Sequence, residues 1–520
     1  LLVALLTAAL AAAPATPAAG ADALYVYDQT AGVSLDLSPE LAGSARDVND
    51  AMAKLETVLR SLTDAQKTDP GVLDVLALLA ENLARRSVSV QAETGRPLTA
   101  ETARQQAESA RAATRAMELL AEKYQVLFLR ELRDGVFFQF EGNAGVQWDD
   151  GLKSVGTEQL TLAAPFASLT VDVSGAAGAM ALDLRPAGGE TARRVDLTEL
   201  ALRYWSVAAM LVLTLVWLAA MFLLKRNIPW WGLAAVCLLA VGLNLTAAGL
   251  PAAGLPAPAA QGAAADDSAV TVTMTGVESA VLSIPIEEAW PDEWVVADAD
   301  GRPAACKYNP VTGTLDARIY ESGDYALRPA AAQFQDIKDK SAEMQQAIYM
   351  LTSRWLMATP EDRAFLPDRE ITRAEFLSAV LNAMHLLDEE AENPFPDVLP
   401  GDWFSAVAAS AYKEKLVEGF EDGTFRGNTP MPKEQMVAIT ANCLTRAMRY
   451  KNPEGAPPAE VLAEYYPDAA QIGRWAESGV ALATRAGVVP ARADGLFAPD
   501  SVMTRGDAAV MMYRLFVKIW

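Results

Sequence analysis

The C-terminal part of the chain repeats itself three times, and this repeat constrains the fold more than any other feature of the 520 residues. Three segments align without gaps, beginning at Glu361, Glu421 and Ala493: "EDRAFLPDREITRAEF", "EDGTFRGNTPMPKEQM" and "ADGLFAPDSVMTRGDA". Each unit is predicted to form a helix, a loop with a glycine turn and a second helix. Units of this size cannot bury their apolar faces alone, so we expect the three to pack together over residues 334–520.

Each repeat carries a cation at the same place, eight residues after its phenylalanine: Arg373, Lys433 and Arg505. In the first repeat, Thr372 and Glu375 have the spacing of a capping box, which explains the residues on either side of the cation but not the cation itself. A cation in the first helical turn faces the positive end of the helix dipole, at a cost of ~0.3–1 kcal/mol. A helix N-terminus with a guanidinium group can bind an anion. The structural alternative is an ion pair between neighbouring repeats.

Other positions match in two of the three units. Gly423 and Gly495 occupy the loop turn, where the first repeat has Arg363. Trp403 and Trp475 each precede their phenylalanine by 22 residues, and the first repeat lacks this tryptophan. The second repeat also has a lysine in place of the arginine, which replaces a planar fork of donors with a point charge. Because the first repeat lacks both the glycine and the tryptophan, any pocket that it helps to form is expected to differ most from the pockets of the other repeats.

The units open with "FQDI" at 334, "FPDV" at 395 and "YPDA" at 466. Together with the tryptophans, "DGTF" and "ITRAE", these motifs resemble the S-layer homology family over residues 334–520. The resemblance implies a pseudo-threefold assembly whose grooves bind secondary cell-wall polysaccharide, often carrying pyruvate ketals. The family's ligand-contacting arginine maps onto two of the cations, and Lys433 takes the second position. The residues expected to bind polysaccharide are Arg373, Lys433, Arg505, Trp403, Trp475, Gly423 and Gly495.

The N-terminal part is predicted to hold three segments. Residues 1–23 have the apolar core and the small-residue end of a secretion signal, without its basic leader. Residues 38–133 show apolar seams of helical period and predict a helical bundle or hairpin, with a coiled-coil interaction arm as the alternative. Residues 136–198 alternate apolar and polar positions and predict a small β module.

The middle of the chain contains two apolar runs of membrane-spanning length, 205–224 and 228–247, which predict a two-helix transmembrane hairpin. A linker rich in Ala, Pro and Gly follows at 248–267. Residues 268–328 contain strand-like segments and predict a β-sandwich-like module. The expected fold class is therefore a multidomain, mainly α protein with two small β modules.

Composition excludes several function classes. The net charge of −23 argues against nucleic-acid binding through a general electrostatic footprint. With three cysteines, a framework of disulfides is not expected. With one histidine, neither a histidine-rich metal site nor His-dependent catalysis is expected. No constellation of catalytic residues is evident, so we expect no enzyme activity, no metal and no cofactor.

These observations predict a non-catalytic protein that tethers the membrane to the cell wall. Its expected partners are an anionic wall polysaccharide, the lipid bilayer and a protein bound by residues 38–133. Its expected location is the cell membrane, with the N- and C-terminal domains extracellular. The alternative is a membrane sensor or a scaffold of an envelope complex, whose helical domain binds a protein.

Overall fold

The fold is taken from a computed structural model, which describes residues 24–26, 35–37, 45–92, 100–148, 157–173, 179–187, 269–286, 293–330, 334–359, 364–450 and 457–518. All of these except Ala187 belong to one compact unit, which combines Leu1–Pro186 with Ser268–Trp520. The segments predicted as signal, transmembrane hairpin and linker (1–23, 205–224, 228–247 and 248–267) lie outside the described residues.

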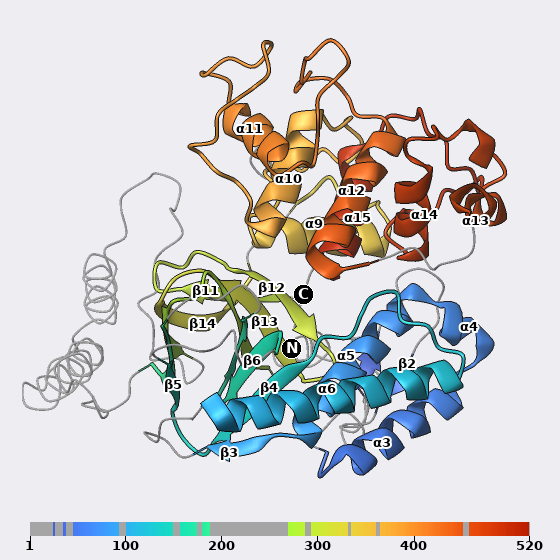
Figure 1. Ribbon diagram of the computed structural model, residues 1–520. Helices are drawn as coiled ribbons and strands as arrows, with labels where there is room; N and C mark the ends of the chain where they lie inside the picture. The colour runs from blue at the N-terminus through green and yellow to red at the C-terminus, as the bar shows by residue number, and fades with distance from the viewer. Residues whose placement is uncertain are drawn as a thin grey trace, which may run out of the picture. The chain divides into compact units, whose positions relative to one another are not determined.

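Residues 48–123 are mainly helical, with one short strand before the last helix (Figure 1). Local capping defines the starts of the first three helices. Asp47 and Asp69 accept hydrogen bonds from the first turns of the helices that they precede, and Thr63 forms a capping box with Gln66. Their apolar faces share one core with the short strand β2. The elements are β1 (Leu24–Val26), β2 (Leu35–Leu37), α3 (Val48–Ser61), α4 (Asp64–Thr68), α5 (Pro70–Ser87) and α6 (Ala100–Lys123).

Two β-sheets form the middle of this unit. One has seven strands in the order β12-β13-β10-β7-β6-β4-β3, and the other has five in the order β11-β14-β9-β8-β5. Alternate residues of both sheets share one apolar core. The strands are β3 (Val90–Ala92), β4 (Gly135–Phe140), β5 (Ala144–Trp148), β6 (Gln159–Ala163), β7 (Ser168–Asp172), β8 (Met180–Pro186), β9 (Val270–Thr275), β10 (Ala280–Pro285), β11 (Trp294–Asp298), β12 (Ala305–Asn309), β13 (Thr314–Ile319) and β14 (Gly323–Pro329).

The predicted fold class is wrong, because these strands make the β part far larger than two small modules. Strand β7 pairs with β10 and β8 pairs with β9, so strands from before and after residues 187–267 alternate in the same sheets. The period-two pattern identified strands but not their partners, which are distant in sequence. The chain is a mixed α and β protein rather than a mainly α one.

The predicted transmembrane hairpin, 205–224 and 228–247, lies outside the described residues and stays a prediction. Across the part of the chain that the structure describes, no helix combines the length and apolar character needed to cross a bilayer.

The C-terminal repeats are helical, as predicted. The second helix of each repeat begins at the predicted cation, at Arg373, Lys433 and Arg505. Phenylalanines 365, 425 and 497 are fully buried in a core shared by all three repeats. The elements are α9 (Ala342–Ser353), α10 (Arg373–Met384), α11 (Ser405–Lys413), α12 (Lys433–Met448), α13 (Pro458–Tyr465), η3 (Ala469–Gln471), α14 (Glu477–Arg485) and α15 (Arg505–Phe516).

Candidate functional site

The starts of α10, α12 and α15 form a closed ring with the loops of the repeats. The backbone N–H of Arg373 donates to Thr429 O at 3.0 Å, and that of Lys433 donates to Ser501 O at 2.9 Å. The ring closes where Arg505 N–H donates to Arg369 O at 2.8 Å. The predicted pseudo-threefold packing therefore has a backbone basis. It also means that the first N–H of each helix is used internally rather than left for an anion.

Each cation packs over the buried phenylalanine of another repeat in the same cyclic order. The Arg373 guanidinium lies 5.4 Å from the Phe425 ring centre, and the Arg505 guanidinium lies 4.6 Å from that of Phe365. The ammonium of Lys433 lies 5.0 Å from the ring centre of Phe497. These cation–π contacts help to hold buried positive charge at the repeat junctions.

Arg505 is fully engaged by the first repeat. Its Nε donates to the carbonyl of Phe365 at 3.0 Å and its Nη2 to the carbonyl of Ala358 at 2.8 Å. Its Nη1 contacts Glu375 Oε1 at 3.4 Å, and the side chain is only 2% exposed. Burial lowers the pKa of Arg505 to about 10, which Glu375 partly opposes. At this position the structure has the inter-repeat ion pair that sequence reasoning left as the alternative.

Arg373 is equally buried but much less engaged. Its Nη1 donates to Gln435 Oε1 at 3.2 Å, whereas its buried Nε has no hydrogen-bond partner among the described residues. The side chain is 6% exposed, and burial lowers its pKa to about 10 with no carboxylate to oppose the shift. An unsatisfied buried guanidinium N–H is costly, so this group is suited to receive an acceptor from a ligand.

A cavity of about 230 Å³ adjoins Arg373 at the junction of the first and second repeats. Phe420 and Arg426 line it on one side, and the segment from Thr429 to Pro432 lines it on the other. The guanidinium of Arg426 stacks 4.1 Å from the Phe420 ring centre and also pairs with Asp422. The cavity therefore presents two guanidinium groups, a hydroxyl and apolar proline surface.

Lys433 is 2% exposed, and within the described part of the chain its ammonium has no hydrogen-bond acceptor. Burial, together with the nearby positive charge of Arg492, lowers its pKa to about 8, against the opposing effect of nearby aspartates. This lysine is therefore close to losing its proton at mildly alkaline pH, unlike the two arginines.

The predicted tryptophans and glycines lie at the surface beside the same junctions. Trp403 and Trp475 are largely exposed. Trp403 packs edge-on against Phe404, and Trp475 lies beside Gly473, whose N–H donates to Glu434 next to Lys433.

Gly423 and Gly495 have φ of +77° and +71°, and a Cβ at either would meet no atom within 4 Å. Backbone angle rather than space therefore favours glycine in these turns. The first repeat's Arg363 lies outside the described residues.

Sequence reasoning missed the role of three aspartates, although it noted the motif that contains them. Asp336, Asp397 and Asp468 each accept backbone N–H groups from two successive residues, the buried phenylalanine and the residue after it. That second residue is left-handed in every repeat, at Leu366, Arg426 and Ala498. Each aspartate therefore holds a turn in place. The left-handed backbone conformation in that turn costs free energy, because the residue that adopts it is not glycine.

We expect Asp468→Ala to lower the free energy of unfolding by about 1–3 kcal/mol, because two backbone donors lose a charged acceptor. Denaturant unfolding followed by circular dichroism measures this loss. The exposed Asp500→Ala removes the same charge and should have little effect. Equal stability of the two variants would show that Asp468 does not hold the turn.

Comparison with known proteins matches this ring to one domain type. The family model of the S-layer homology domain matches residues 333–377, 394–437 and 465–509. The C-terminal part of the chain therefore consists of three S-layer homology repeats, which confirms the resemblance seen in the motifs.

Similar proteins share only part of their length with this chain. The amylopullulanase of Thermoanaerobacterium thermosulfurigenes is 29% identical over 267 residues, 48% of this chain and 14% of that protein. Exoglucanase XynX of Acetivibrio thermocellus is 31% identical over 186 residues, 36% of this chain and 16% of that protein. The cellulosome-anchoring protein of the latter organism is 26% identical over 126 residues, 23% of this chain and 28% of that protein. This chain thus spans less than a third of each of these relatives.

Proposed function

We propose that the chain is a non-catalytic surface protein that binds an anionic cell-wall polysaccharide through its three S-layer homology repeats. The observation that carries this proposal is the buried Nε of Arg373, which has no partner and adjoins a cavity. The names of similar proteins, which include a cellulosome-anchoring protein and a surface-layer protein, support a place at the cell surface.

The lining of this cavity suits a pyruvate ketal on a sugar. A ketal presents a carboxylate beside a methyl group, and the cavity offers guanidinium groups beside Pro430, Met431 and Pro432. A carboxylate can accept two parallel N–H bonds from a guanidinium fork. The Thr429 hydroxyl at the same cavity donates to the carbonyl of Arg426 at 2.7 Å, and its oxygen can accept a hydrogen bond from a sugar hydroxyl. The exposed faces of Trp403 and Trp475 are suited to stacking on further sugar rings.

The test compares two forms of one polymer. Purified wall polysaccharide is used either intact or after mild acid has removed its ketals, and each form is titrated into the full chain. We expect the intact form to bind at least about tenfold more tightly, the value of one charged hydrogen bond. Equal affinity for the two forms would contradict recognition of the ketal.

The low pKa of Lys433 predicts that polymer binding weakens as the pH rises. Its pKa in the folded chain is about 8, against an ordinary value of 10.5. Between these values the unfolded chain holds more protons, so this lysine makes the free energy of unfolding rise with pH. Binding of an anion requires the charged lysine, so affinity should fall up to about tenfold from pH 7 to pH 9.

Titration of the polymer at pH 7 and pH 9 measures the expected fall in affinity. Melting temperatures at the same two pH values measure the expected gain in stability. Lys433→Met should bind more weakly at pH 7 and lose the pH dependence. An unchanged pH dependence in Lys433→Met would assign it to another group.

The protein partner proposed for residues 38–133 stays a prediction. The lipid-bilayer partner rested on residues 205–247, which lie outside the described residues, and is not part of the proposal.

A further inference from the structure

A second and larger cavity, of about 810 Å³, lies over the face of the seven-stranded sheet opposite its apolar core. Residues of α5 line it on one side, and residues of β6, β7, β10, β12 and β13 line it on the other. A helix that covers a sheet normally buries an apolar face. Here the sheet residues that alternate with the core are mostly polar, so the covered face is a candidate binding site rather than a second core.

The polar residues of this face form rows across the strands. Thr161 lies opposite Thr170, and their hydroxyl oxygens are 3.0 Å apart. In the neighbouring row Ser168 lies opposite Ser283, which lies opposite Asp316. The cavity floor therefore presents a lattice of hydroxyl groups and a carboxylate, which can donate to and accept from the hydroxyls of a sugar.

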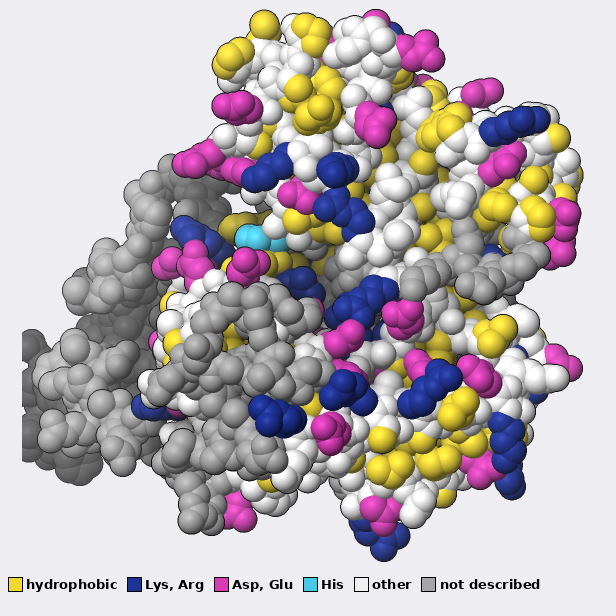
Figure 2. Space-filling model, in the orientation of Figure 1, with side chains coloured by type: hydrophobic (Ala, Val, Ile, Leu, Met, Phe, Trp, Pro, Cys, Tyr) yellow, Lys and Arg dark blue, Asp and Glu magenta, His cyan; other side chains and the backbone are white. Residues whose placement is uncertain are grey.

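Positive charge exceeds negative charge around this cavity. Six cationic side chains line it, against four acidic ones, in a chain whose net charge is −23. Acidic and basic side chains are interspersed on the face of the molecule in Figure 2, so this excess is a local feature. Clefts that concentrate one sign of charge attract the opposite charge.

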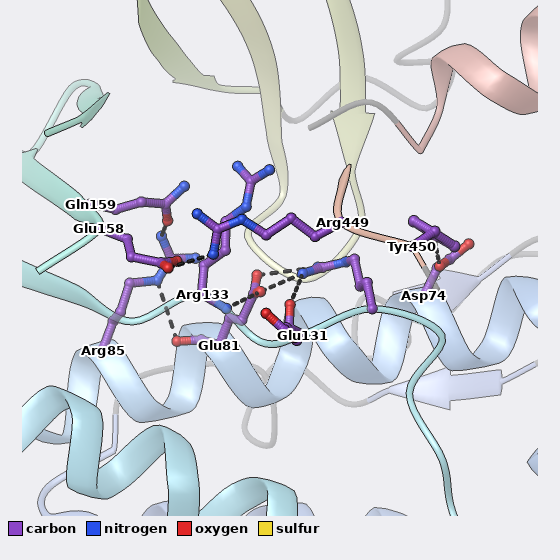
Figure 3. A network of polar contacts seen from close by, with 10 residues as sticks. Asp74, Glu81, Arg85, Glu131, Arg133, Glu158, Gln159, Arg449 and Tyr450 are labelled. Atoms are coloured by element: carbon purple, nitrogen blue, oxygen red, sulfur yellow. Dashed lines mark hydrogen bonds and ion pairs between the residues drawn. The ribbon is translucent and has the colours of Figure 1, made fainter. Parts of the chain in front are cut away.

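Much of the acidic charge is already committed within the protein. Glu81 binds Arg130 through both carboxylate oxygens and also accepts the N–H of Arg133 (Figure 3). Asp316 accepts hydrogen bonds from Asn309 and Thr314. These two acidic groups are engaged in internal contacts, while six cationic side chains line the same cavity.

Arg85 of α5 extends toward the sheet, where its Nη1 donates to Gln159 Oε1 at 2.9 Å (Figure 3). Its Nε donates to the carbonyl of Glu81 in its own helix at 3.3 Å. Burial lowers the pKa of Arg85 and of Arg133 below the usual value, and it lowers that of Lys307 to about 7. Burial is the largest cause of each shift, and it outweighs the opposing attraction of nearby carboxylates such as Glu81 and Asp316.

We propose that this cavity binds an anionic saccharide, a sugar bearing carboxylate or phosphate groups, as a second site separate from the S-layer homology repeats. Arg85 and Arg318, from opposite walls, bind the acid group, and the hydroxyls of Thr170 and Ser283 bind the sugar. Its volume lies within the usual range for small-molecule sites. An acidic peptide fits less well, because peptide recognition uses a sheet edge or apolar anchor pockets and this cavity has one aromatic residue, Phe137, in its lining.

Calorimetric titration of the full chain tests this proposal with four probes. Trigalacturonate supplies carboxylates, glucose 6-phosphate supplies a phosphate, maltotriose is the neutral control, and a tri-glutamate peptide represents the alternative ligand. We expect at least one anionic sugar to bind about tenfold or more tightly than maltotriose. Absence of binding by both anionic sugars, or tighter binding of the peptide, would overturn the proposal.

Variants of residues that line this cavity test whether the anionic sugar binds there. Arg85→Gln and Arg318→Gln should each weaken binding of the anionic sugar about tenfold or more. Ala163→Phe fills the cavity without changing its charge, and should weaken binding even if an arginine variant proves unstable. The exposed Arg302→Gln is the matched control and should bind as the unaltered chain does.

Arg373→Gln separates this site from the repeats, because it should leave sugar binding at the cavity unchanged. If Arg373→Gln abolishes binding while Arg85→Gln and Ala163→Phe retain it, the anionic sugar binds the repeats and the proposal is wrong. Sedimentation of Arg85→Gln with purified walls should stay normal, so failure of this second site leaves the proposed wall binding intact.

Discussion

Arg505→Ala is expected to lower the free energy of unfolding by about 3–5 kcal/mol, because it removes one partner of a buried ion pair. The change leaves Glu375 without this cation and frees two carbonyls of the first repeat, those of Phe365 and Ala358. It keeps the backbone N–H of residue 505 that closes the ring, but removes the side-chain contacts of the third repeat with the first. Denaturant unfolding of the full chain measures the loss.

Polymer binding by this variant should fall only in proportion to its folded fraction. The control is Arg446→Ala, which removes an exposed arginine that pairs with Glu414 on the helix surface. Exposed pairs of this kind contribute about 0–1 kcal/mol. If Arg505→Ala unfolds like the control and yet loses polymer affinity, Arg505 is a ligand-binding residue and its assignment as a structural one is wrong.

Arg373→Ala should have the opposite profile, with a small change in stability and a large loss of polymer affinity. Its guanidinium makes one hydrogen bond to a side chain and none through Nε, so little internal bonding is lost. Each charged hydrogen bond to the ligand is worth about 1.5–3 kcal/mol, which corresponds to a loss of roughly tenfold to a hundredfold in affinity.

Arg373→Lys separates charge from geometry at this position. It keeps the charge but not the planar fork, and should bind with intermediate affinity. Titration of the wall polymer into each variant, with its melting temperature, provides the data. A large fall in melting temperature with unchanged affinity per folded molecule would make Arg373 a structural residue.

The helices of the repeats could be predicted from sequence because their signals are local. Thr372 and Glu375 form the predicted capping box, and Thr504 caps α15 in the same way. The differences among the three cations could not be predicted, because they depend on distant loops. The Arg505 side chain donates to the carbonyls of Ala358 and Phe365, whereas the Arg373 side chain donates to Gln435 and, in the part of the chain that the structure describes, to no carbonyl.

The β-sheets were the main failure of sequence reasoning. Alternating patterns located strands such as β7, β8 and β10, but alternation does not encode the pairing partner. The pairs β7 with β10 and β8 with β9 join segments on either side of residues 187–267. The sequence pattern alone predicts a separate module on each side of that stretch. The large cavity was missed for the same reason, since Arg85, Gln159 and Arg318 meet only when those sheets form.

Binding of the full chain to purified cell walls tests the central claim most directly. Walls are used intact and after extraction of their secondary polysaccharide, and the bound fraction of the chain is measured by sedimentation for the unaltered protein and for Arg373→Ala. The proposal predicts that the unaltered chain sediments with intact walls but not with extracted walls, and that Arg373→Ala stays mostly in the supernatant with both. Equal sedimentation with extracted and intact walls, or normal sedimentation of Arg373→Ala at limiting wall concentration, would contradict it.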